Sequence, residues 1–380
     1  MMPGRRHGTR TTIPATRPWF PPDQERFILG AVRTVLRTGR LILGPYTQQL
    51  ERRFARHVGM PHAVAVSSCT AALEIALRWG RIAGGEVVIP TNTFVATANA
   101  VWLAGGQPVL ADIDPQTLCL DVEDLRRRAT RRTRAVIVVH IGGLVHPRIG
   151  EIRSFCRRRK LLLVEDAAHA AGATLDGRRA GSFGDVGCFS FYPTKVMTSL
   201  VGGMVVTRNR GLAEFARSMR HHGVGPRGLL DIRRLGNDFL LDEIRAAVGI
   251  AQLRGLEPAI RLRRRVAALY DRLLRDLPVA ILRAPQGGRH VYYKYLVVLR
   301  TAAERRRAAT ALRARAIEVG SLYEPPVHRQ PYHAAALGYR HGDFPAADDV
   351  LPRVLALPLH PGMTAGAVRA VVAALRATLA

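Results

Sequence analysis

Lysine is almost absent from this chain, although the chain is strongly basic. Only three of its 57 basic side chains are lysines, at positions 160, 195 and 294, and the formal net charge is +28. In a chain that so rarely uses lysine, a lysine inside a segment rich in glycine and aromatic residues is expected to be there for its amine. Lys195 lies in such a segment and is therefore the first candidate for chemistry.

Long apolar runs and paired cysteines are also missing. No run of about 18 apolar residues occurs, so no membrane span is predicted. The basic start of the chain is not followed by an apolar stretch, so we expect no secretory signal and a cytoplasmic protein. The four cysteines lie far apart without a C-x-x-C pair, which argues against a zinc site or a disulfide framework. We expect reduced, packed cysteines and no metal site.

The positive charge is spread along the chain in short arginine clusters, and it allows two interpretations. One is a compositional arginine bias displayed on solvated helix faces. The other is an electropositive protein that attracts phosphorylated substrates or, without specificity, nucleic acid. No zinc-finger, KH or RRM signature is present, so no specific nucleic-acid partner is predicted.

The chain alternates short β-branched runs with helical patterns, which predicts an α/β fold. Alternation at this spacing implies crossover connections and a mostly parallel central sheet covered by helices. Expected strands are 63–66, 86–89, 108–111, 135–139, 161–165, 187–191 and 203–207. Expected helices among and before them are 23–38, 48–57, 70–79, 94–103 and 149–158.

The remaining sequence predicts a smaller C-terminal α+β domain. A helix is expected over 236–256, with Pro258 interrupting it before a long helix to about 277. A strand over 291–299 and helices over 302–316 and from about 364 follow. The predicted organisation is a disordered basic arm (1–18), a large domain (19–255) and a small domain (256–380).

Lys195 closes the segment Ser190-Phe191-Tyr192-Pro193-Thr194-Lys195, directly after an apolar strand. An amine that is partly desolvated beside a packed strand end favours its neutral form, which can attack an aldehyde cofactor. From this segment alone, a lysine that simply reaches solvent from a loop is an equal alternative.

Asp166 and His169 follow the next candidate strand, in Glu165-Asp166-Ala167-Ala168-His169. The carboxyl ends of strands in open α/β sheets are where ligands bind. Strand alternation points Glu165 and Asp166 to opposite sides, so one of them can face a site. Asp166 has the chemistry to pair with a pyridine nitrogen, and His169 to lie beside the ring. A structural histidine is the commoner outcome for such a pattern.

Two further turns offer partners for a phosphorylated, flat cofactor. Ser68, Cys69 and Thr70 lie where a strand gives way to a helix, and a helix start suits a phosphate. Capping of the helix by these hydroxyl groups is an equal alternative. Phe94, at another strand-to-helix turn, has a ring that suits stacking on a flat cofactor, although most such residues are core.

Taken together these segments resemble the DegT/StrS-type sugar aminotransferases, which have the aspartate-aminotransferase fold (fold type I) of pyridoxal-phosphate (PLP) enzymes. The likeness covers nearly the whole chain after the arm. It runs through Gly44-Pro45, 67–73, 90–97, Ile113-Asp114, 139–143, 165–170, 189–195, Gly202-Gly203, His222-Gly223, 246–253 and 323–328.

The resemblance implies a role for each matching residue. Lys195 would hold PLP as a Schiff base and then shuttle a proton, Asp166 would pair with the ring nitrogen, and His169 would lie beside the ring with Phe94 on the opposite face. The phosphate would be held by Cys69 through its N–H, by Thr70 and by Ser190. Asn237 would reach the phosphate of a neighbouring subunit, because sites in this family form between the two chains of a homodimer.

Two departures from the family pattern concern the substrate pocket. The loop that usually reads Gly-Glu-Gly-Gly is Leu200-Val201-Gly202-Gly203 here, and the usual Asn-x-x-Arg-Met pattern is replaced by Asn237-Asp238-Phe239-Leu240-Leu241. An acid and an arginine have both become apolar. Either the pair was lost together, which costs far less than losing one member, or the pocket for substrate or amino donor has changed.

The sequence therefore predicts a PLP-dependent aminotransferase that moves an amino group from glutamate or glutamine to a keto-sugar. A nucleotide-linked keto-sugar is the favoured acceptor. An aminocyclitol (keto-inositol) aminotransferase uses the same chemistry and is barely separated from it. A non-catalytic PLP-fold partner protein is favoured by the apolar Leu200, Val201 and Leu240. A dehydratase of the same fold is disfavoured, because such relatives tend to replace the Schiff-base lysine with histidine.

Overall fold

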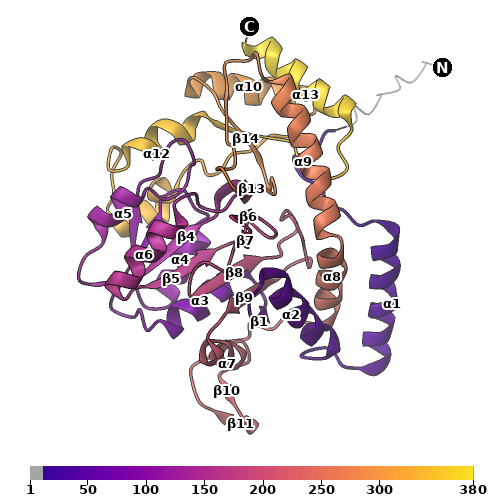
Figure 1. The fold of residues 1–380 in the computed structure, drawn as a ribbon, viewed down its shortest axis with the longest axis vertical. Coiled ribbons are helices and arrows are strands. Elements are labelled where there is room, and N and C mark those ends of the chain that lie inside the picture. The colour runs from indigo at the N-terminus through magenta and orange to yellow at the C-terminus, as the bar shows by residue number, and fades with distance from the viewer. Residues whose placement is uncertain (1–11, 380) are drawn as a thin grey trace, which may run out of the picture.

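A seven-stranded sheet forms the centre of the molecule in the computed structural model, which describes residues 12–379 (Figure 1). Its strand order is β1-β9-β8-β5-β4-β2-β3. Only β9 runs antiparallel to its neighbours. The predicted mostly parallel α/β sheet is thus confirmed. The strands are β1 (His62–Val66), β2 (Glu86–Pro90), β3 (Gln107–Ala111), β4 (Thr133–Val139), β5 (Leu162–Asp166), β8 (Val186–Ser190) and β9 (Gly203–Thr207).

All seven strands were expected from the sequence, with ends that differ by at most two residues. They are almost entirely buried, as strands covered on both faces must be. The helices in this part of the chain are α1 (Pro22–Thr38), α2 (Pro45–Val58), α3 (Cys69–Trp79), α4 (Ala96–Leu103), α5 (Val122–Arg128), α6 (Ile149–Arg159), α7 (Arg210–Met219) and α8 (Glu243–Arg254), with a 3-10 turn η1 (Ile141–Gly143).

The C-terminal part has a second hydrophobic core built on a three-stranded antiparallel sheet, β12-β14-β15. The long helix α9 (Leu256–Leu273) contributes to both cores, through Leu256 and Ile260 to the first and Tyr270 to the second. The division of the chain at residue 255 stays a prediction. The elements are β12 (Ala280–Ile281), β14 (Tyr295–Val298), β15 (Val354–Leu357), α10 (Ala302–Ala314), α11 (Pro331–Leu337), α12 (Pro345–Val350), α13 (Ala365–Leu379), η2 (Val327–Arg329) and η3 (Leu351–Arg353).

Two small sheets complete the fold. One joins β6 (Thr174–Leu175), β7 (Arg178–Arg179) and β13 (Gly288–Arg289). It connects the segment between β5 and β8 with the C-terminal part of the chain. The other is a hairpin of β10 (Val224–Gly225) and β11 (Gly228–Ile232), which projects from the body below α7 at the bottom of Figure 1.

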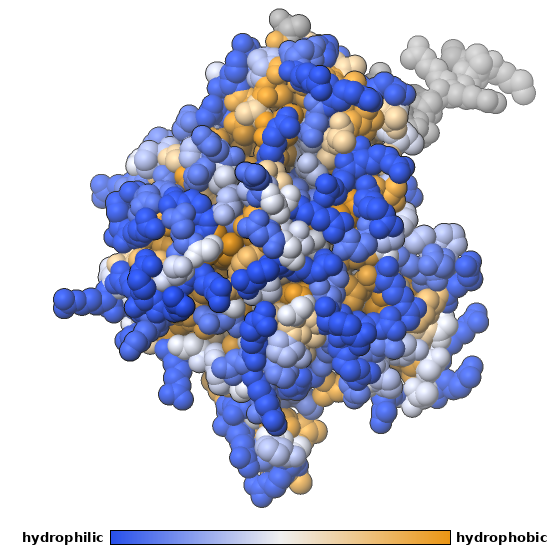
Figure 2. All heavy atoms as spheres, viewed as in Figure 1, coloured by the Kyte–Doolittle hydropathy of each residue, from blue (hydrophilic) through white to orange (hydrophobic). Residues whose placement is uncertain are grey.

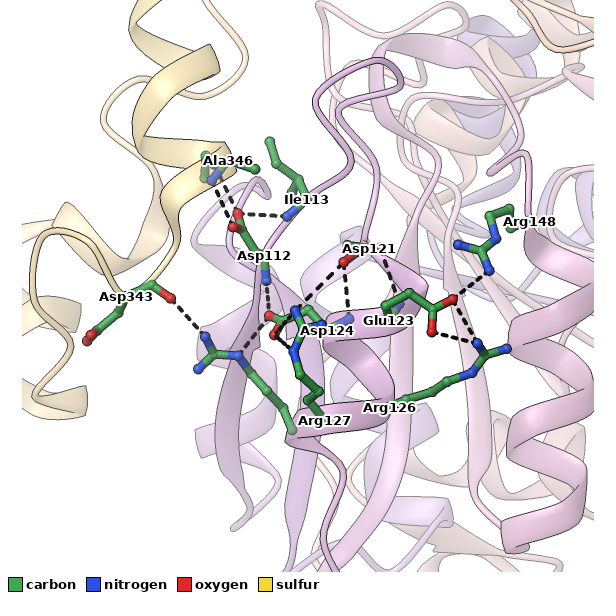
Figure 3. Close-up of polar contacts among 12 residues, drawn as sticks. Asp112, Ile113, Asp121, Glu123, Asp124, Arg126, Arg127, Arg148, Asp343 and Ala346 are labelled. Carbon is green, nitrogen blue, oxygen red and sulfur yellow. Dashed lines mark hydrogen bonds and ion pairs between the residues drawn. The ribbon is translucent and has the colours of Figure 1, made fainter.

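The C-terminal segment is also fastened to the end of β3 by Asp112, as Figure 3 shows. The Asp112 carboxylate accepts hydrogen bonds from the backbone N–H groups of Ala346 and Ala347, both at 2.9 Å, in the first turn of α12. A carboxylate at a helix start satisfies N–H groups that have no partner within the helix. Arg128 adds a bond to the Asp343 carbonyl.

Residues 12–18, which the sequence assigns to a disordered arm, are held against the C-terminal part. Ile13 forms a parallel bridge with Ile317, and the Ala15 N–H donates to Glu318 at 2.9 Å. This order differs from the expectation, because β-type backbone pairing needs no apolar pattern that the sequence would reveal. Residues 1–11 of the predicted arm lie outside the described residues.

The helix predicted over 236–256 is wrong at its start, because α8 begins only at Glu243. Asp242 is the N-cap, and its side chain accepts from the Arg245 N–H. The break near the end of this run is also misplaced: Gly255 separates α8 from α9, and Pro258 lies within the first turn of α9. A proline is tolerated there because its missing N–H would have had no helical partner.

The four cysteines are free and buried, as expected. Within the described residues, no helix is long and apolar enough to cross a membrane. Figure 2 shows hydrophilic side chains spread over most of the visible face, with smaller groups of apolar side chains among them.

Candidate functional site

Most of the predicted site residues meet at the carboxyl edge of the central sheet. Asp166 is the last residue of β5, Ser190 the last of β8, and Ser68 follows β1 by two residues. Gly203, the first residue of β9, pairs with Val66 on one side and with Ser190 on the other. A Cβ at position 203 would lie 2.3 Å from the backbone of Ser68, so glycine is required there.

Asp166 is buried and receives donors on both oxygens. The Thr97 hydroxyl donates to Oδ2 at 2.9 Å, and the Ala168 N–H donates to Oδ1 at 3.1 Å. Burial raises the pKa of Asp166, and the Ala168 and Thr97 bonds and the charge of Lys195 only partly offset that rise. The carboxylate is therefore poised for a further cationic partner.

His169 is buried three residues further on. Its Nε2 lies 3.0 Å from the Tyr323 hydroxyl, while its buried Nδ1 has no hydrogen-bond partner among residues 12–379. The ring stacks on Tyr293, with centroids 4.3 Å apart and planes at 23°. Burial, and then the positive charges of Lys195 and Lys294, hold the pKa of His169 well below its usual range, so the ring is neutral.

Lys195 lies in the loop after β8, and its Nζ is 4.5 Å from the centre of the Tyr293 ring. The positive charge of Lys195 acts to lower the pKa values of Asp166, His169 and Cys69. The amine therefore lies close to these predicted site residues. The amine, the carboxylate and the imidazole that the sequence singled out are thus brought together.

The start of α3 provides a second part of the site. The Ser68 hydroxyl accepts from the Ala71 N–H at 3.1 Å and so caps the helix. The first intrahelical bond runs from Ala72 to Ser68, so the N–H groups of Cys69 and Thr70 precede the helical ladder. Because Gly203 contacts the Ser68 backbone and pairs with Ser190, the Ser190 side chain lies on the neighbouring strand end.

Two predicted residues lie apart from this cluster. Phe94 is 58% exposed, and its ring centre is 6.0 Å from that of Tyr323. Asn237 is exposed in the segment after β11, where its carbonyl accepts from the His222 N–H at 3.0 Å.

Several residues at the site were not singled out from the sequence. Tyr323 is positioned by Asn92, whose Oδ1 accepts from the Tyr323 N–H at 2.8 Å. The same segment is anchored by Thr91, whose hydroxyl lies 2.6 Å from Nδ1 of His328. Tyr293 and Lys294 lie in the irregular stretch before β14, which has no periodic pattern to reveal them. The scarcity of lysine was the one available signal for Lys294.

Glu165 points to the other side of β5, as strand alternation predicts. It is fully buried and accepts from the N–H groups of Gly181, Phe183 and Gly184. Its Oε2 also lies 2.7 Å from Nε2 of His140. These bonds give Glu165 a structural role.

The arrangement fits PLP on its own chemistry. Asp166 is a buried carboxylate that forms no ion pair with any side chain in the described part of the chain, and a protonated ring nitrogen would supply that partner. His169 offers an unpartnered buried nitrogen, the start of α3 offers N–H groups suited to a phosphate, and Lys195 offers an amine for an aldehyde.

The chain is similar in sequence and in structure to known proteins. The family model described as "DegT/DnrJ/EryC1/StrS aminotransferase family" matches residues 22–376. The spore coat polysaccharide biosynthesis protein SpsC of Bacillus subtilis is 35% identical, with 91% of this chain and 92% of that protein covered. The dTDP-4-dehydro-2,3,6-trideoxy-D-glucose 4-aminotransferase of Saccharopolyspora spinosa is 34% identical, with 90% and 91% covered. The crystal structure of the aminotransferase TlmJ from Streptoalloteichus hindustanus superposes with a TM-score of 0.89 at 32% identity, over 97% of this chain and 98% of that one.

Proposed function

Because the chain belongs to the DegT/DnrJ/EryC1/StrS family of PLP-dependent aminotransferases, we propose that it transfers an amino group from glutamate or glutamine to the ketone carbon of a nucleotide-linked sugar. The observation that carries the proposal is the meeting of Lys195, Asp166 and His169 at one sheet edge, beside the start of α3.

Each residue has a task that its surroundings support. Bound PLP supplies an electron sink for the substrate carbon. Asp166 would hold the ring nitrogen protonated, and neutral His169 would lie beside the ring. Lys195 would attach the cofactor and would hold the proton that moves to and from the substrate carbon. The Cys69 and Thr70 N–H groups with Ser190 would bind the phosphate, and Phe94 would have to move toward the cluster to cover the exposed face of the ring.

A nucleotide-linked acceptor is supported by a relative and by charge. The Saccharopolyspora spinosa protein, 34% identical, is named for a dTDP-linked sugar. The net charge of +28 comes almost wholly from arginine, whose planar fork matches the oxygens of a diphosphate. A keto-inositol acceptor would use the same residues without the diphosphate.

We further propose a homodimer whose two sites lie between the chains. Leu41, Ile42, Leu200 and Val201 are all more than two-fifths exposed. Both pairs lie near the start of α8, because Ile42 forms a bridge with Asp242 and the carbonyl of Val201 accepts from Arg245. This surface includes the loop that follows Lys195, so a second copy covering it would also close the site.

The experiment is an absorbance spectrum of purified protein with PLP, before and after glutamate or glutamine is added. We expect a band of Lys195-bound cofactor that either donor converts, and no such band in Lys195→Ala. Lys160→Ala, which removes an exposed lysine, is the matched control and keeps the band.

The acceptor is then tested by adding a dTDP- or UDP-linked keto-sugar, or a keto-inositol, to the donor-converted protein. Return of the original band with the nucleotide sugar alone supports the proposal, while return with the keto-inositol alone replaces it. A bound cofactor that no donor converts indicates a non-catalytic protein. Absence of the band in the unaltered protein excludes the function altogether.

A further inference from the structure

A cleft of about 520 Å³ lies at the amino edge of the central sheet. Its wall includes Leu162, which begins β5, Asp185, which precedes β8, and Arg208, which follows the antiparallel β9. The candidate PLP site is at the other edge, where Asp166 ends β5 and Ser190 ends β8. A strand as long as β5 spans about 13 Å, so the cleft is separate from that site.

Five exposed cations from four segments of the chain line this cleft. They are Arg153 and Arg157 of α6, Lys160 directly after it, Arg178 of β7 and Arg208 directly after β9. In the part of the chain that the structure describes, none of the five forms an ion pair with a carboxylate. Asp185 is the only acidic residue of the wall, and its carboxylate accepts from the Leu163 N–H at 2.8 Å. The cleft therefore has an uncompensated positive charge.

The general arginine bias of the chain explains only part of this arrangement. The last turn of α6 favours positive side chains because of the helix dipole, which accounts for Arg157. It does not account for Arg178 and Arg208, which reach the same cleft from other segments. Arg153 and Arg157 are four residues apart on one helix, a spacing at which like charges repel. An anion bound between them would remove that repulsion.

Two of the cations have features that favour a binding role. The Arg178 guanidinium lies 4.5 Å from the centre of the Phe183 ring and donates to the Ser182 carbonyl at 2.7 Å, so its position is fixed. Lys160 has a φ of 54°, in the left-handed region that favours glycine. A lysine at such a position, in a chain with only three lysines, favours a use for its ammonium group.

The cleft also offers an aromatic ring to a flat ligand. Trp79 is in its wall and is half-buried, whereas Phe183, the other aromatic residue there, is buried. An edge-on contact with Phe215, at 5.5 Å between ring centres, holds the indole. The volume lies within the range of about 300–1,000 Å³ that is usual for small-molecule sites. Clustered arginines suit phosphate oxygens and an indole suits a heterocyclic base.

We propose that this cleft is a second ligand site, which binds a nucleoside diphosphate through its phosphates on the five cations and its base against Trp79. Binding is non-covalent and needs neither PLP nor amino transfer, so the inference goes beyond the proposed function and does not depend on it. A nucleotide can occupy the cleft while the site at the carboxyl edge is filled.

The test is a calorimetric titration of the full chain, incubated with PLP, with ADP as the probe. We expect ADP to bind, pyrophosphate to bind more weakly, and adenosine to show no binding. The double variant Arg153→Gln with Arg157→Gln should bind ADP at least about tenfold more weakly, because hydrogen bonds to charged groups are lost.

The matched control is Arg33→Gln with Arg37→Gln, which removes two exposed arginines at the same spacing on α1. It should bind ADP like the unaltered protein, and thermal melts check that both double variants fold. Any ADP bound at the carboxyl edge contributes equally to both variants and cancels in the comparison. Equal weakening in the two would show that ADP follows the net charge alone and would overturn the inference.

Tryptophan fluorescence places the base. We expect ADP to change the emission of the unaltered protein and of Trp102→Phe, but not that of Trp79→Phe. Equal affinities for ADP and pyrophosphate, or an emission change that persists in Trp79→Phe, would overturn the assignment of a nucleotide. Binding of a single-stranded oligonucleotide without any binding of ADP would replace the nucleotide with nucleic acid and refute the proposal.

Discussion

Thr97 controls Asp166 more directly than any other side chain at the site. Its hydroxyl donates to Oδ2 at 2.9 Å in a fully buried place, and it also lies 2.7 Å from the Thr93 hydroxyl. Thr97→Val keeps the volume but removes the donor. A hydrogen bond to a charged group contributes about 1.5–3 kcal/mol, so we expect PLP to bind at least about tenfold more weakly, as measured by absorbance titration.

Thr93→Val is the matched control, because it leaves the bond from Thr97 to Asp166 in place. It should bind PLP close to the affinity of the unaltered protein. Thermal melts of both variants without cofactor check that each folds. Equal affinities for the two variants would show that the Thr97 bond does not help to hold the cofactor.

The sequence could bring Lys195, Asp166, His169 and Ser68 together because each follows a buried strand, and parallel strands end at one edge. It could not reveal Tyr293, which lies in an irregular stretch and reaches the site only when the C-terminal part folds back. Asp166 was predicted by residue type, but the donor from Thr97 depends on how α4 packs, which no local pattern reports.

At the scale of elements, the hairpin β10–β11 projects from the body of the molecule below α7 (Figure 1). Leu230 is 99% exposed and Leu229 is 65% exposed, so the hairpin presents apolar side chains that the rest of the described chain leaves uncovered. Such patches mark interaction surfaces. We expect the hairpin to extend the interface of the proposed homodimer beyond the surface of Leu41, Ile42, Leu200 and Val201. Leu230→Asp should then weaken self-association at least about tenfold, the scale of an interface hot spot, as measured by sedimentation.

Leu103→Asp tests whether any new surface charge has this effect, since Leu103 is 53% exposed at the end of α4. It should associate like the unaltered protein. If Leu230→Asp remains as dimeric as this control, the hairpin lies outside the interface.

Strands were easier to predict than helix starts, and α8 shows the reason. The apolar run Phe239-Leu240-Leu241 lies just before α8, and no glycine or proline separates it from that helix, so the sequence prediction extended the helix back to 236. The backbone there instead pairs with other segments: the Phe239 N–H donates to Arg220, and Ser67 donates to Phe239. Asp242 was the local signal for the true start, because its side chain caps the helix.

Glu243 illustrates how such long-range capping joins elements. Its buried carboxylate accepts from the N–H groups of Gly44, Tyr46 and Thr47, at the start of α2. The sequence shows the motif Gly44-Pro45, but it does not show that the partner of this motif is Glu243, which lies 199 residues after Gly44.

At the scale of the whole molecule, buried neutral histidines set the pH dependence of stability. His146 donates from Nε2 to the Leu120 carbonyl at 2.9 Å and accepts at Nδ1 from the Arg148 N–H at 3.1 Å, so it has no room for a second proton. Burial lowers the pKa of His146 to about 4 and that of His290 to about 3.

These two histidines predict a loss of stability in mild acid. Between about pH 6.5 and pH 4 the unfolded chain binds protons that the folded chain does not, so stability is complete above this window and falls as the pH drops through it. The slope is about 1.4 kcal/mol per pH unit for each histidine. Asp166 and Glu324, whose pKa values are raised, act in the opposite sense, but the histidines with lowered pKa values outnumber them. We expect the free energy of unfolding, from denaturant titrations, to be lower at pH 5 than at pH 7.

The difference should shrink in His146→Gln, whose amide can still donate to Leu120 but does not titrate, and should persist in His341→Gln, which removes an exposed histidine. An equal pH difference in both variants would mean that His146 is protonated without penalty in the folded chain, and the acid sensitivity would then have to come from other groups.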